Sequence, residues 1–484
     1  MKTLFYNARL VDAYSDNDGA ILIEDGFITN VFMGFLLPSI FKKFLNESPD
    51  IKLVDCKGLV LMPSFVDMHA HFRYPGQSHK EELSTALKAA VAGGFGTLLL
   101  MPNTSPVVSS PAEARFVQLQ ASQFKLADVI QSISITNRFD GLNSDHLINL
   151  DSSEHPVVSE DGKDVGAASV MLEAMRKCAK NNVLVSCHCE DVSFAEAARI
   201  PRGDVITLLK QDEVAQSVAQ NNGIEEASHE ERFAQINKCM QNAEQLLAAA
   251  EDLATTRNLY LAEVAGCNIH IAHVSTAASL EAVEQAKAKR GSAVSCEVTP
   301  HHLALSGSMI EFVNPPIRPE SDRQALIDGI KRGVVDCIAT DHAPHSKDEK
   351  KHGACGFSGL ETAFSVCYSE LVLKKHITLS KLSALMSANP AKRLGTNCGI
   401  LRPGRQADFV LIDLDKKWTV DSTKFYSKGK HSPFNGLTLS GKIMQTIHRG
   451  KVVFSADDLQ LDYPRDDDPE TEAAEQENKA EAES

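Results

Sequence analysis

The sequence predicts an α/β fold: a (β/α)8 TIM barrel with a small composite β-sandwich domain built from the N-terminal and C-terminal segments. Three observations support this prediction. Eight apolar, β-rich runs alternate with helical segments in the middle of the chain, and eight strands close a barrel. Both ends of the chain contain short strands and turns instead. Histidine and aspartate recur at the carboxyl ends of the apolar runs, which meet on one face of such a barrel.

The apolar runs are separated by amphipathic segments that end at Gly or Asn, as helices do. The stretch 199–265 between the fifth and sixth runs is far longer than a simple crossover, and its pattern predicts long helices. We interpret it as an elaborated crossover and not as a separate domain. The eight runs are 59–69, 95–103, 128–136, 155–161, 182–191, 268–275, 293–302 and 334–345.

The two β-rich ends are expected to pair into one sheet domain beside the barrel. Residues 33–50 interrupt the first of them, and we interpret this insertion as a helix that is buried or faces another copy of the chain. The alternative for this insertion is membrane attachment. We expect a homo-oligomer, a dimer. The predicted bounds are 1–60 and 395–460 for the two parts of the sandwich, 61–394 for the barrel and 461–484 for an acidic, disordered tail.

Composition excludes several classes of protein. With 43% hydrophobic and 23% charged residues the chain is an ordinary globular protein. Its formal net charge is −15, so it offers no basic surface for nucleic acid or anionic lipid, and we expect no nucleic-acid partner. The longest apolar run, Val31 to Leu37, is too short to span a bilayer, so we expect no membrane association.

Cysteine usage bears on the compartment. The chain has eleven cysteines, an odd number, and no CxxC pair. This pattern argues against a disulfide framework and for a reducing environment. The N-terminus also lacks the apolar stretch of a signal peptide. We expect a cytoplasmic protein.

The first apolar run ends in His69-Ala70-His71. Residues i and i+2 of a strand point to the same side, so both imidazoles can reach one metal ion. Five other runs also carry a His or Asp at their carboxyl ends, and each of these residues alone is more often a capped turn or a hydrogen-bonded core residue. Together they would form a costly polar cluster unless a cation neutralised them. The six candidate ligands are His69, His71, Asp161, His188, His273 and Asp341.

Four imidazole and two carboxylate ligands suit zinc, and six ligands with one placed to bridge suit a pair of ions. Such a centre lowers the pKa of bound water to about 7 and polarises a carbonyl, which favours hydrolytic acyl chemistry. A carboxylate beside the metal could move the proton from that water to a leaving nitrogen, and Asp341 is the best placed. The alternative for Asp341 is that it only caps the following helix.

Seven motifs together resemble the dihydroorotase family of the amidohydrolase superfamily, in its single-chain bacterial form. They are PSFVDMHAHFRYPG, MPNTSP, HCED, AHVST, CEVTPHHL, NPPIR and TDHAPH, and the resemblance covers roughly Asn7 to Phe454. It implies a (β/α)8 barrel with a composite β-sandwich, in agreement with the independent prediction above. It also implies the reversible, zinc-dependent interconversion of N-carbamoyl-L-aspartate and (S)-dihydroorotate, a step of pyrimidine biosynthesis.

The resemblance also implies roles for the predicted ligands. His69 and His71 match the pair that binds the first zinc with Asp341, and His188 and His273 match ligands of the second. Asp161 matches the aspartate that bridges the two ions in some bacterial members, where other relatives use a carboxylated lysine. The family usually has DDG where this chain has EDG. Lys163 is therefore the alternative bridge.

A dianionic substrate such as carbamoyl aspartate requires positive charge in its site. Arg73 lies two residues beyond His71 on the same side of the strand end, which suits it to bind the α-carboxylate. Asn103 and His345 match the remaining carboxylate contacts of the family. Each of the three has a simpler alternative, namely a surface arginine, a turn residue and a loop histidine.

Two other functions remain open from the sequence. A hydantoinase or allantoinase would use the same metal chemistry, but its substrates lack the carboxylate that Arg73 is expected to bind. A catalytically inactive relative could instead act as a scaffold for an aspartate transcarbamoylase. Such relatives typically lose metal ligands, whereas this sequence keeps all six candidates.

Overall fold

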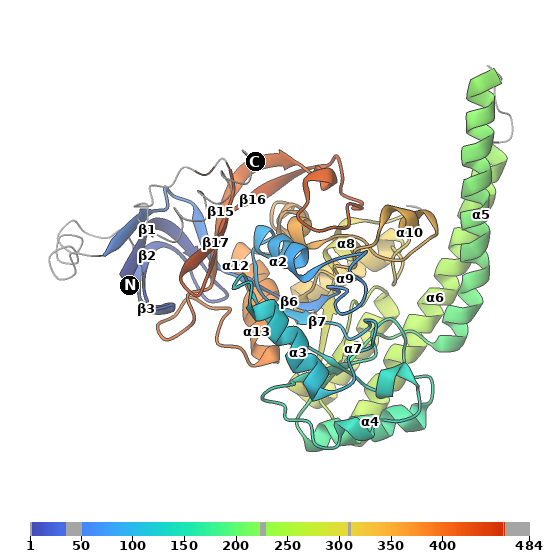
Figure 1. The fold of residues 1–484 in the computed structure, drawn as a ribbon, viewed down its shortest axis with the longest axis horizontal. Coiled ribbons are helices and arrows are strands. Elements are labelled where there is room, and N and C mark those ends of the chain that lie inside the picture. The colour runs from blue at the N-terminus through green and yellow to red at the C-terminus, as the bar shows by residue number, and fades with distance from the viewer. Residues whose placement is uncertain (1, 35–50, 223–228, 308–310, 458, 460–484) are drawn as a thin grey trace, which may run out of the picture.

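The structure is a computed structural model that describes residues 2–34, 51–222, 229–307, 311–457 and 459. A barrel of parallel strands lies beside a sheet built from both ends of the chain, and two long helices extend from the far side of the barrel (Figure 1). The predicted fold class is confirmed. The predicted domain bounds stay a prediction, and residues 35–50 and the tail 461–484 lie outside the described residues.

The barrel strands form two parallel sheets, β6-β7-β8 and β9 to β14. Only Ser132 separates β8 from β9, so these two segments act as one barrel strand. A parallel bridge between Ala70 and His342 closes the ring, and the His71 amide donates to the His342 carbonyl at 2.8 Å. The strands are β6 (Phe65–Ala70), β7 (Phe95–Leu100), β8 (Asp128–Gln131), β9 (Ile133–Ser134), β10 (Val157–Ser159), β11 (Leu184–Cys187), β12 (Ile269–Ile271), β13 (Val294–Val298) and β14 (Cys337–Ile338).

The strands β6 and β7 are buried at every position, which explains why they read as continuous apolar runs without alternation. Helices cover their outer faces, and several end at Gly or Asn, as the sequence indicated. Thr276 caps α7 by accepting from the Ser279 amide, and Gly333 ends α9 with a φ of 80°, which glycine adopts without strain. The helices outside the long crossover are α2 (Leu83–Ala92), α3 (Pro111–Ser122), α4 (Ala168–Lys180), α7 (Ala277–Arg290), α8 (Pro300–Ala304), α9 (Glu320–Arg332), α10 (Lys347–Lys351), α11 (Ala363–Cys367), α12 (Leu379–Ser383) and α13 (Asn389–Leu394).

Strands from the N-terminal and C-terminal segments of the chain form one sheet, the end sheet. Its strand order is β17-β16-β15-β5-β1-β2-β3, with β4 paired to β1. Its central contact is the antiparallel pair of β15 with β5, in which Phe409 lies opposite Pro63. The strands are β1 (Lys2–Val11), β2 (Asp16–Glu24), β3 (Phe27–Met33), β4 (Lys52–Asp55), β5 (Val60–Pro63), β15 (Phe409–Thr419), β16 (Thr438–His448) and β17 (Lys451–Ser455).

The first predicted barrel run, 59–69, is in fact two strands that belong to different sheets. The break lies at Ser64, whose amide donates to Asp408 beside the end sheet, whereas the next amide, that of Phe65, donates to Gly94 beside β7. The pair Pro63-Ser64 stands at this point of the run, but it does not identify the new partner strand.

The long crossover forms a helical hairpin of α5 (Val192–Asn222) and α6 (His229–Ala265), which run side by side and project from the barrel (Figure 1). The base of the hairpin is anchored by a buried cluster of Val205 from α5 and Ile236 and Met240 from α6 around Phe312. The prediction of an elaborated crossover agrees with this arrangement. No described helix is both long and apolar enough to cross a membrane.

Candidate metal centre and substrate site

All six predicted ligands lie at the same mouth of the barrel. His69 is near the end of β6, and the other five follow the carboxyl ends of β6, β10, β11, β12 and β14. Parallel strands of a closed barrel present these ends on one face. The structure therefore brings together residues that are up to 272 positions apart, and all six are buried.

Three of the ligands form the first group. The Nε2 atom of His71 lies 3.2 Å from Asp341 Oδ1, and the Nε2 atom of His69 lies 3.6 Å from the same oxygen. Ligand atoms of all three residues lie within 4.8 Å of one another. This spacing leaves room for one ion between them.

Asp161 lies between the first group and the remaining two histidines. Its Oδ1 atom is 3.2 Å from His69 Nε2, 3.3 Å from His188 Nδ1 and 3.7 Å from His273 Nε2, while its Oδ2 atom is 3.4 Å from His71 Nε2. A carboxylate in this place can reach ions on both sides.

Lys163, the alternative bridge, points away from the cluster. Its side chain is exposed and its Nζ atom donates to the carbonyl of Phe139 at 3.2 Å. The structure therefore favours Asp161 over Lys163 at the centre of the ligand set.

The residues fit a metal centre by a separate criterion. His69 Nε2 and Asp161 Oδ1 face each other in the buried cluster, and neither atom makes a hydrogen bond to any described residue. Buried polar atoms normally find a partner, and an ion is one explanation for such exceptions. Imidazole nitrogens and carboxylate oxygens suit zinc and other divalent transition metals.

The charges in the metal-free cluster are strongly coupled. Burial alone would lower the pKa of His69, but Asp161 and Glu297 outweigh it and hold the pKa well above its usual value. Burial would raise the pKa of Asp161, but His69 and His71 hold that pKa well below its usual value. Asp161 is thus ionised and His69 protonated, whereas burial lowers the pKa of His71, and a cation would replace the proton of His69.

The three predicted substrate residues line the same mouth. Arg73 Nη2 lies 3.2 Å from His345 Nε2, and Arg73 Nε donates to the carbonyl of Pro344 at 3.2 Å. Asn103 contacts the ligands directly, since its Oδ1 is 2.9 Å from His71 Nδ1 and its Nδ2 donates to Asp161 at 3.3 Å.

Comparison with known proteins assigns the family. The model of the amidohydrolase family matches residues 60–453, which is most of the chain. The chain belongs to this amidohydrolase family. The resemblance predicted from the motifs is confirmed.

Curated relatives of this amidohydrolase span nearly its whole length. It is 37% identical over 456 residues to a dihydroorotase of Clostridium botulinum, which covers 94% of this chain and 100% of the relative. It is 34% identical over 458 residues to a dihydroorotase of Bacillus subtilis, with 91% and 98% covered.

Solved structures support the fold of the amidohydrolase. The L-hydantoinase (dihydropyrimidinase) of Arthrobacter aurescens superposes with a TM-score of 0.75 at 23% identity, covering 95% of this chain and 98% of that one. The dihydropyrimidinase of Brevibacillus agri NCHU1002 gives 0.73 at 21% identity, with 94% and 95% covered. At these identities the likeness shows the fold alone.

Sequence reasoning missed the residue that orients His69. Glu297 of β13 accepts from His69 Nδ1 at 2.9 Å with one oxygen and contacts His270 Nε2 at 3.0 Å with the other. Such carboxylate partners fix the ring and tautomer of a ligand histidine. The signal was present, because Glu297 is the one acidic residue in the otherwise apolar run 293–302.

Glu190 of the HCED motif plays a similar part for His188. Its Oε2 atom lies 3.5 Å from His188 Nε2, and its other oxygen accepts from the Asn314 amide of the NPPIR motif. Burial would raise the pKa of Glu190, but His188 and Asn314 lower it to about 2. Glu190 therefore remains ionised and joins two motifs that are 124 residues apart.

The backbone of the amidohydrolase is strained at its mouth. Three residues of the site have positive φ values although none is glycine: His273 at 34°, Asp341 at 48° and Arg73 at 57°. Such conformations persist only where the surroundings over-determine them, and they concentrate at functional sites.

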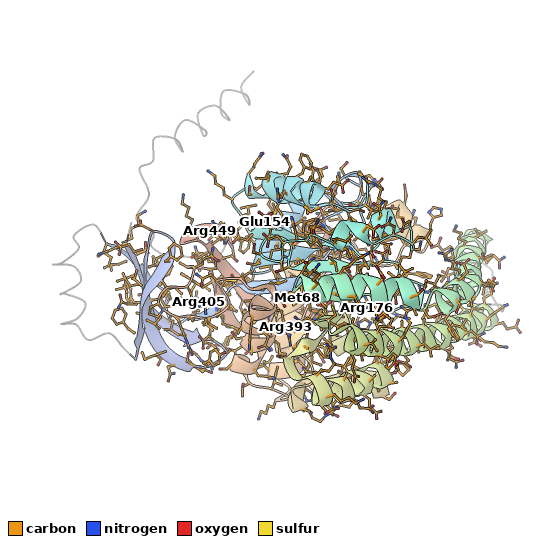
Figure 2. The ribbon with its side chains drawn as sticks, turned by 90° about the horizontal axis from the view of Figure 1, so that it is seen from below. Met68, Glu154, Arg176, Arg393, Arg405 and Arg449 are labelled. Carbon is orange, nitrogen blue, oxygen red and sulfur yellow. The ribbon has the colours of Figure 1, made fainter. Side chains whose placement is uncertain are left out.

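A second group of potential ligands lies at the opposite end of the barrel. Asp128 begins β8, and with Asp408 and His448 it offers ligand atoms within 4.8 Å of one another. Arg449 lies between the end sheet and the barrel and donates to both oxygens of Asp128, at 2.8 and 3.0 Å (Figure 2).

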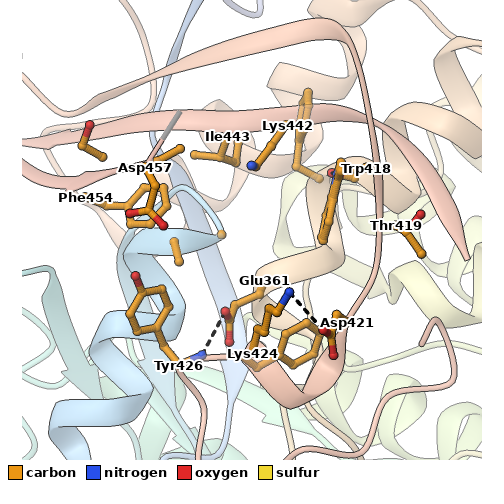
Figure 3. Close-up of a pocket in the computed structure, with 17 residues that line it drawn as sticks. Glu361, Trp418, Thr419, Asp421, Lys424, Tyr426, Lys442, Ile443, Phe454 and Asp457 are labelled. Carbon is orange, nitrogen blue, oxygen red and sulfur yellow. Dashed lines mark hydrogen bonds and ion pairs between the residues drawn. The ribbon is translucent and has the colours of Figure 1, made fainter. Parts of the chain in front are cut away.

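Two cavities outside the mouth contain none of the nine predicted site residues. One, of about 490 Å³, lies between the end sheet and the barrel and is walled by Trp418, Tyr426 and Phe454, with Glu361 accepting from the Tyr426 amide (Figure 3). The other, of about 600 Å³, is lined in part by Asp128 and Arg449. Neither adjoins the His and Asp cluster.

Proposed function

We propose that this amidohydrolase is a dihydroorotase, which reversibly interconverts N-carbamoyl-L-aspartate and (S)-dihydroorotate in pyrimidine biosynthesis. Relatives of that name match nearly the whole chain at 37% and 34% identity. The observation that carries the proposal is the environment of Arg73. This side chain is 7% exposed, lies beside the ligand cluster and forms no ion pair with any described residue. A buried charge needs a partner, and the carboxylate of the substrate supplies one.

The proposal includes two zinc ions. His69, His71 and Asp341 would hold the first, His188 and His273 the second, and Asp161 would bridge them. Bound zinc supplies Lewis acidity, which lowers the pKa of a coordinated water to about 7 and polarises a carbonyl.

The substrate residues would fix the orientation of the ring. Burial lowers the pKa of Arg73 to about 10, so the guanidinium stays charged at neutral pH and can bind the α-carboxylate with two parallel hydrogen bonds. Burial and then Arg73 lower the pKa of His345 to about 3, so its imidazole is neutral and adds no second charge beside the guanidinium. Asn103 holds His71 and Asp161 and can present the same amide to the substrate.

Asp341 would move the proton. Burial would raise its pKa, but His71 and His69 outweigh burial and lower it, so the carboxylate is ionised at neutral pH. In hydrolysis it accepts the proton of the attacking water and returns it to the ring nitrogen that leaves the amide carbonyl. In ring closure it takes the proton from the ureido nitrogen. Lower pH favours closure because that direction consumes a proton.

The remaining predictions belong to the same proposal. We expect a homodimer located in the cytoplasm, acting on a small-molecule substrate. All eleven cysteines are free thiols, which supports a reducing compartment. The residue bounds predicted for the barrel and sandwich also remain part of the proposal.

A hydantoinase is the second candidate, because the solved structures named above are hydantoinases and dihydropyrimidinases. Hydantoin and allantoin lack the carboxylate that Arg73 would bind, so the charge of the site disfavours them. A panel assay of dihydroorotate, hydantoin and allantoin separates the candidates. Faster turnover of hydantoin than of dihydroorotate would contradict the proposal.

The decisive experiment measures zinc stoichiometry alongside dihydroorotate hydrolysis in the native protein and in His71→Ala. We expect about two equivalents of zinc in the native protein, and loss of zinc with loss of hydrolysis in the variant. A native protein that is metal-free and inactive but binds an aspartate transcarbamoylase would favour the scaffold instead.

A further inference from the structure

Glu251, in the middle of α6, is a charged residue that is 4% exposed. Its carboxylate accepts from the amides of Ser275 at 2.8 Å and Thr276 at 3.1 Å, and from the Ser275 hydroxyl. It also accepts from Arg318 Nη2 at 3.1 Å. The side chain thus connects the long crossover hairpin to the turn that follows β12.

Arg318 completes this network from the NPPIR segment. It is 4% exposed, and its Nε atom donates to the Ser275 hydroxyl at 2.9 Å. Its two terminal nitrogens donate to the backbone carbonyls of Glu244 at 3.0 Å and Leu247 at 3.2 Å, both on α6. The four hydrogen bonds that Arg318 donates thus go to α6 or to the Ser275 hydroxyl.

The turn held by Glu251 carries a candidate zinc ligand. His273 lies two residues before Ser275 and has a φ of 34°, in the left-handed region that a non-glycine residue adopts only under constraint. Its imidazole Nε2 lies 2.8 Å from His188 Nδ1 and 3.7 Å from Asp161 Oδ1. Within the described residues, the hydrogen bonds of Ser275 and Thr276 to Glu251 fix the backbone that leads away from this strained position.

We propose that Glu251 is a positioning residue for the second zinc site: it holds the turn 274–276 so that His273 keeps its strained conformation and faces Asp161 and His188. Glu251 makes its hydrogen bonds to Ser275, Thr276 and Arg318 and to none of the six candidate ligands. Arg318 is the counter-charge of the buried carboxylate and joins the NPPIR segment to the same point. This inference rests on the zinc centre of the proposed function.

The test is zinc affinity, measured site by site with competing chelators in the full-length protein. In Glu251→Gln one oxygen can still accept the two amides, but the new NH2 group faces Arg318, and the buried guanidinium loses its counter-charge. We expect the second zinc to bind about 10-fold to 100-fold more weakly, as for other residues that orient metal ligands, with the first zinc unchanged. Glu251→Asp should restore part of the affinity. Glu244→Gln is the matched control, because Arg318 contacts its backbone carbonyl and not its side chain.

A folded Glu251→Gln protein that binds both zinc ions as tightly as wild type overturns the proposal, and so does an equal weakening of both ions. If Glu251→Gln fails to fold, Ser275→Ala tests the proposal instead. It removes the hydroxyl contacts to Glu251 and Arg318 and keeps the hydrogen bond from the Ser275 amide to Glu251. We expect a smaller but still selective loss of the second zinc in Ser275→Ala, and unchanged affinity there overturns the proposal. Failure of the proposed function is distinct, because the wild-type protein would then bind no zinc or would hydrolyse hydantoin in place of dihydroorotate, whereas this inference is decided by the zinc affinities of the variants.

Discussion

Two clusters of His, Asp and Arg lie at opposite ends of the same barrel, and they differ in how their charges are balanced. At the carboxyl ends of the strands, Asp161 and Asp341 face four histidines, and the nearby Arg73 pairs with neither carboxylate. At the other end, Arg449 donates to both oxygens of Asp128, and its backbone amide donates to Asp408 at 2.6 Å.

Ligand atoms lie close together at both ends of the barrel, so their grouping alone does not indicate a metal site; the charges around them also matter. The Nε2 and Nδ1 atoms of His448 face different carboxylates, Asp128 at 3.7 Å and Asp408 at 3.2 Å. Arg449 supplies one positive charge to this pair of carboxylates. Buried atoms without a hydrogen bond among the described residues occur in both clusters: His448 Nδ1 and Asp408 Oδ2 here, and His69 Nε2 and Asp161 Oδ1 at the mouth. The carboxylates at the mouth have no arginine paired with them among the described residues, so the mouth has the greater need of a cation.

The largest expected effect comes from removing a carboxylate at the mouth, with removal of a carboxylate at the other end as the control. Asp341→Ala should lose turnover of dihydroorotate by at least about a hundredfold, the usual scale of a general acid or base, while His69, His71 and Asp161 retain zinc. Asp128→Ala is the matched control at the other end and should keep wild-type turnover. Steady-state kinetics on variants of known zinc content check both. A zinc-loaded Asp341→Ala protein with near wild-type turnover would remove Asp341 from the mechanism.

The second effect is the pH dependence of zinc binding. The pKa values of His69 and His188 are held above the usual value in the metal-free cluster, so both imidazoles carry protons at neutral pH that zinc must displace. Affinity should therefore rise with pH, by about tenfold per pH unit for each proton displaced. Chelator competition at pH 6, 7 and 8 measures this slope, and His448→Ala should leave it unchanged. An affinity that stays constant between pH 6 and 8 would show that the metal-free histidines are neutral.

The candidate ligands at the mouth could be predicted from the sequence because their positions depend only on where each barrel strand ends. A residue at the carboxyl end of a barrel strand faces one common mouth whatever the rest of the fold does. This rule places His188 and His273 together without knowledge of any contact. It also separates Asp161, which ends a strand and faces the cluster, from Lys163, which lies two residues further and is exposed.

The supporting residues could not be predicted in the same way, because their partners are set by packing between distant segments. Glu297 reaches His69 across 228 residues, and Glu251 on α6 meets Arg318 across 67 residues. The change of sheet at Ser64 coincides with the pair Pro63-Ser64, but that pair does not identify the new partner strand. A buried acidic residue in such a run is a usable signal that a partner exists, but it does not identify the partner.

The smallest expected effect comes from removing the positive charge of Arg449 from the second cluster. Arg449 is 58% exposed in its side chain, so its ion pair with Asp128 contributes about 1 kcal/mol or less to stability. Arg449→Met should therefore lower the free energy of unfolding only slightly, as measured by urea denaturation. It also removes the positive charge beside Asp128, so the variant should bind more zinc than wild type, with the extra ion held weakly. Because the proposed zinc centre lies at the opposite end of the barrel, turnover should not change. An Arg449→Met protein with no extra zinc would mean that the geometry of His448, and not the charge of Arg449, keeps this cluster free of metal.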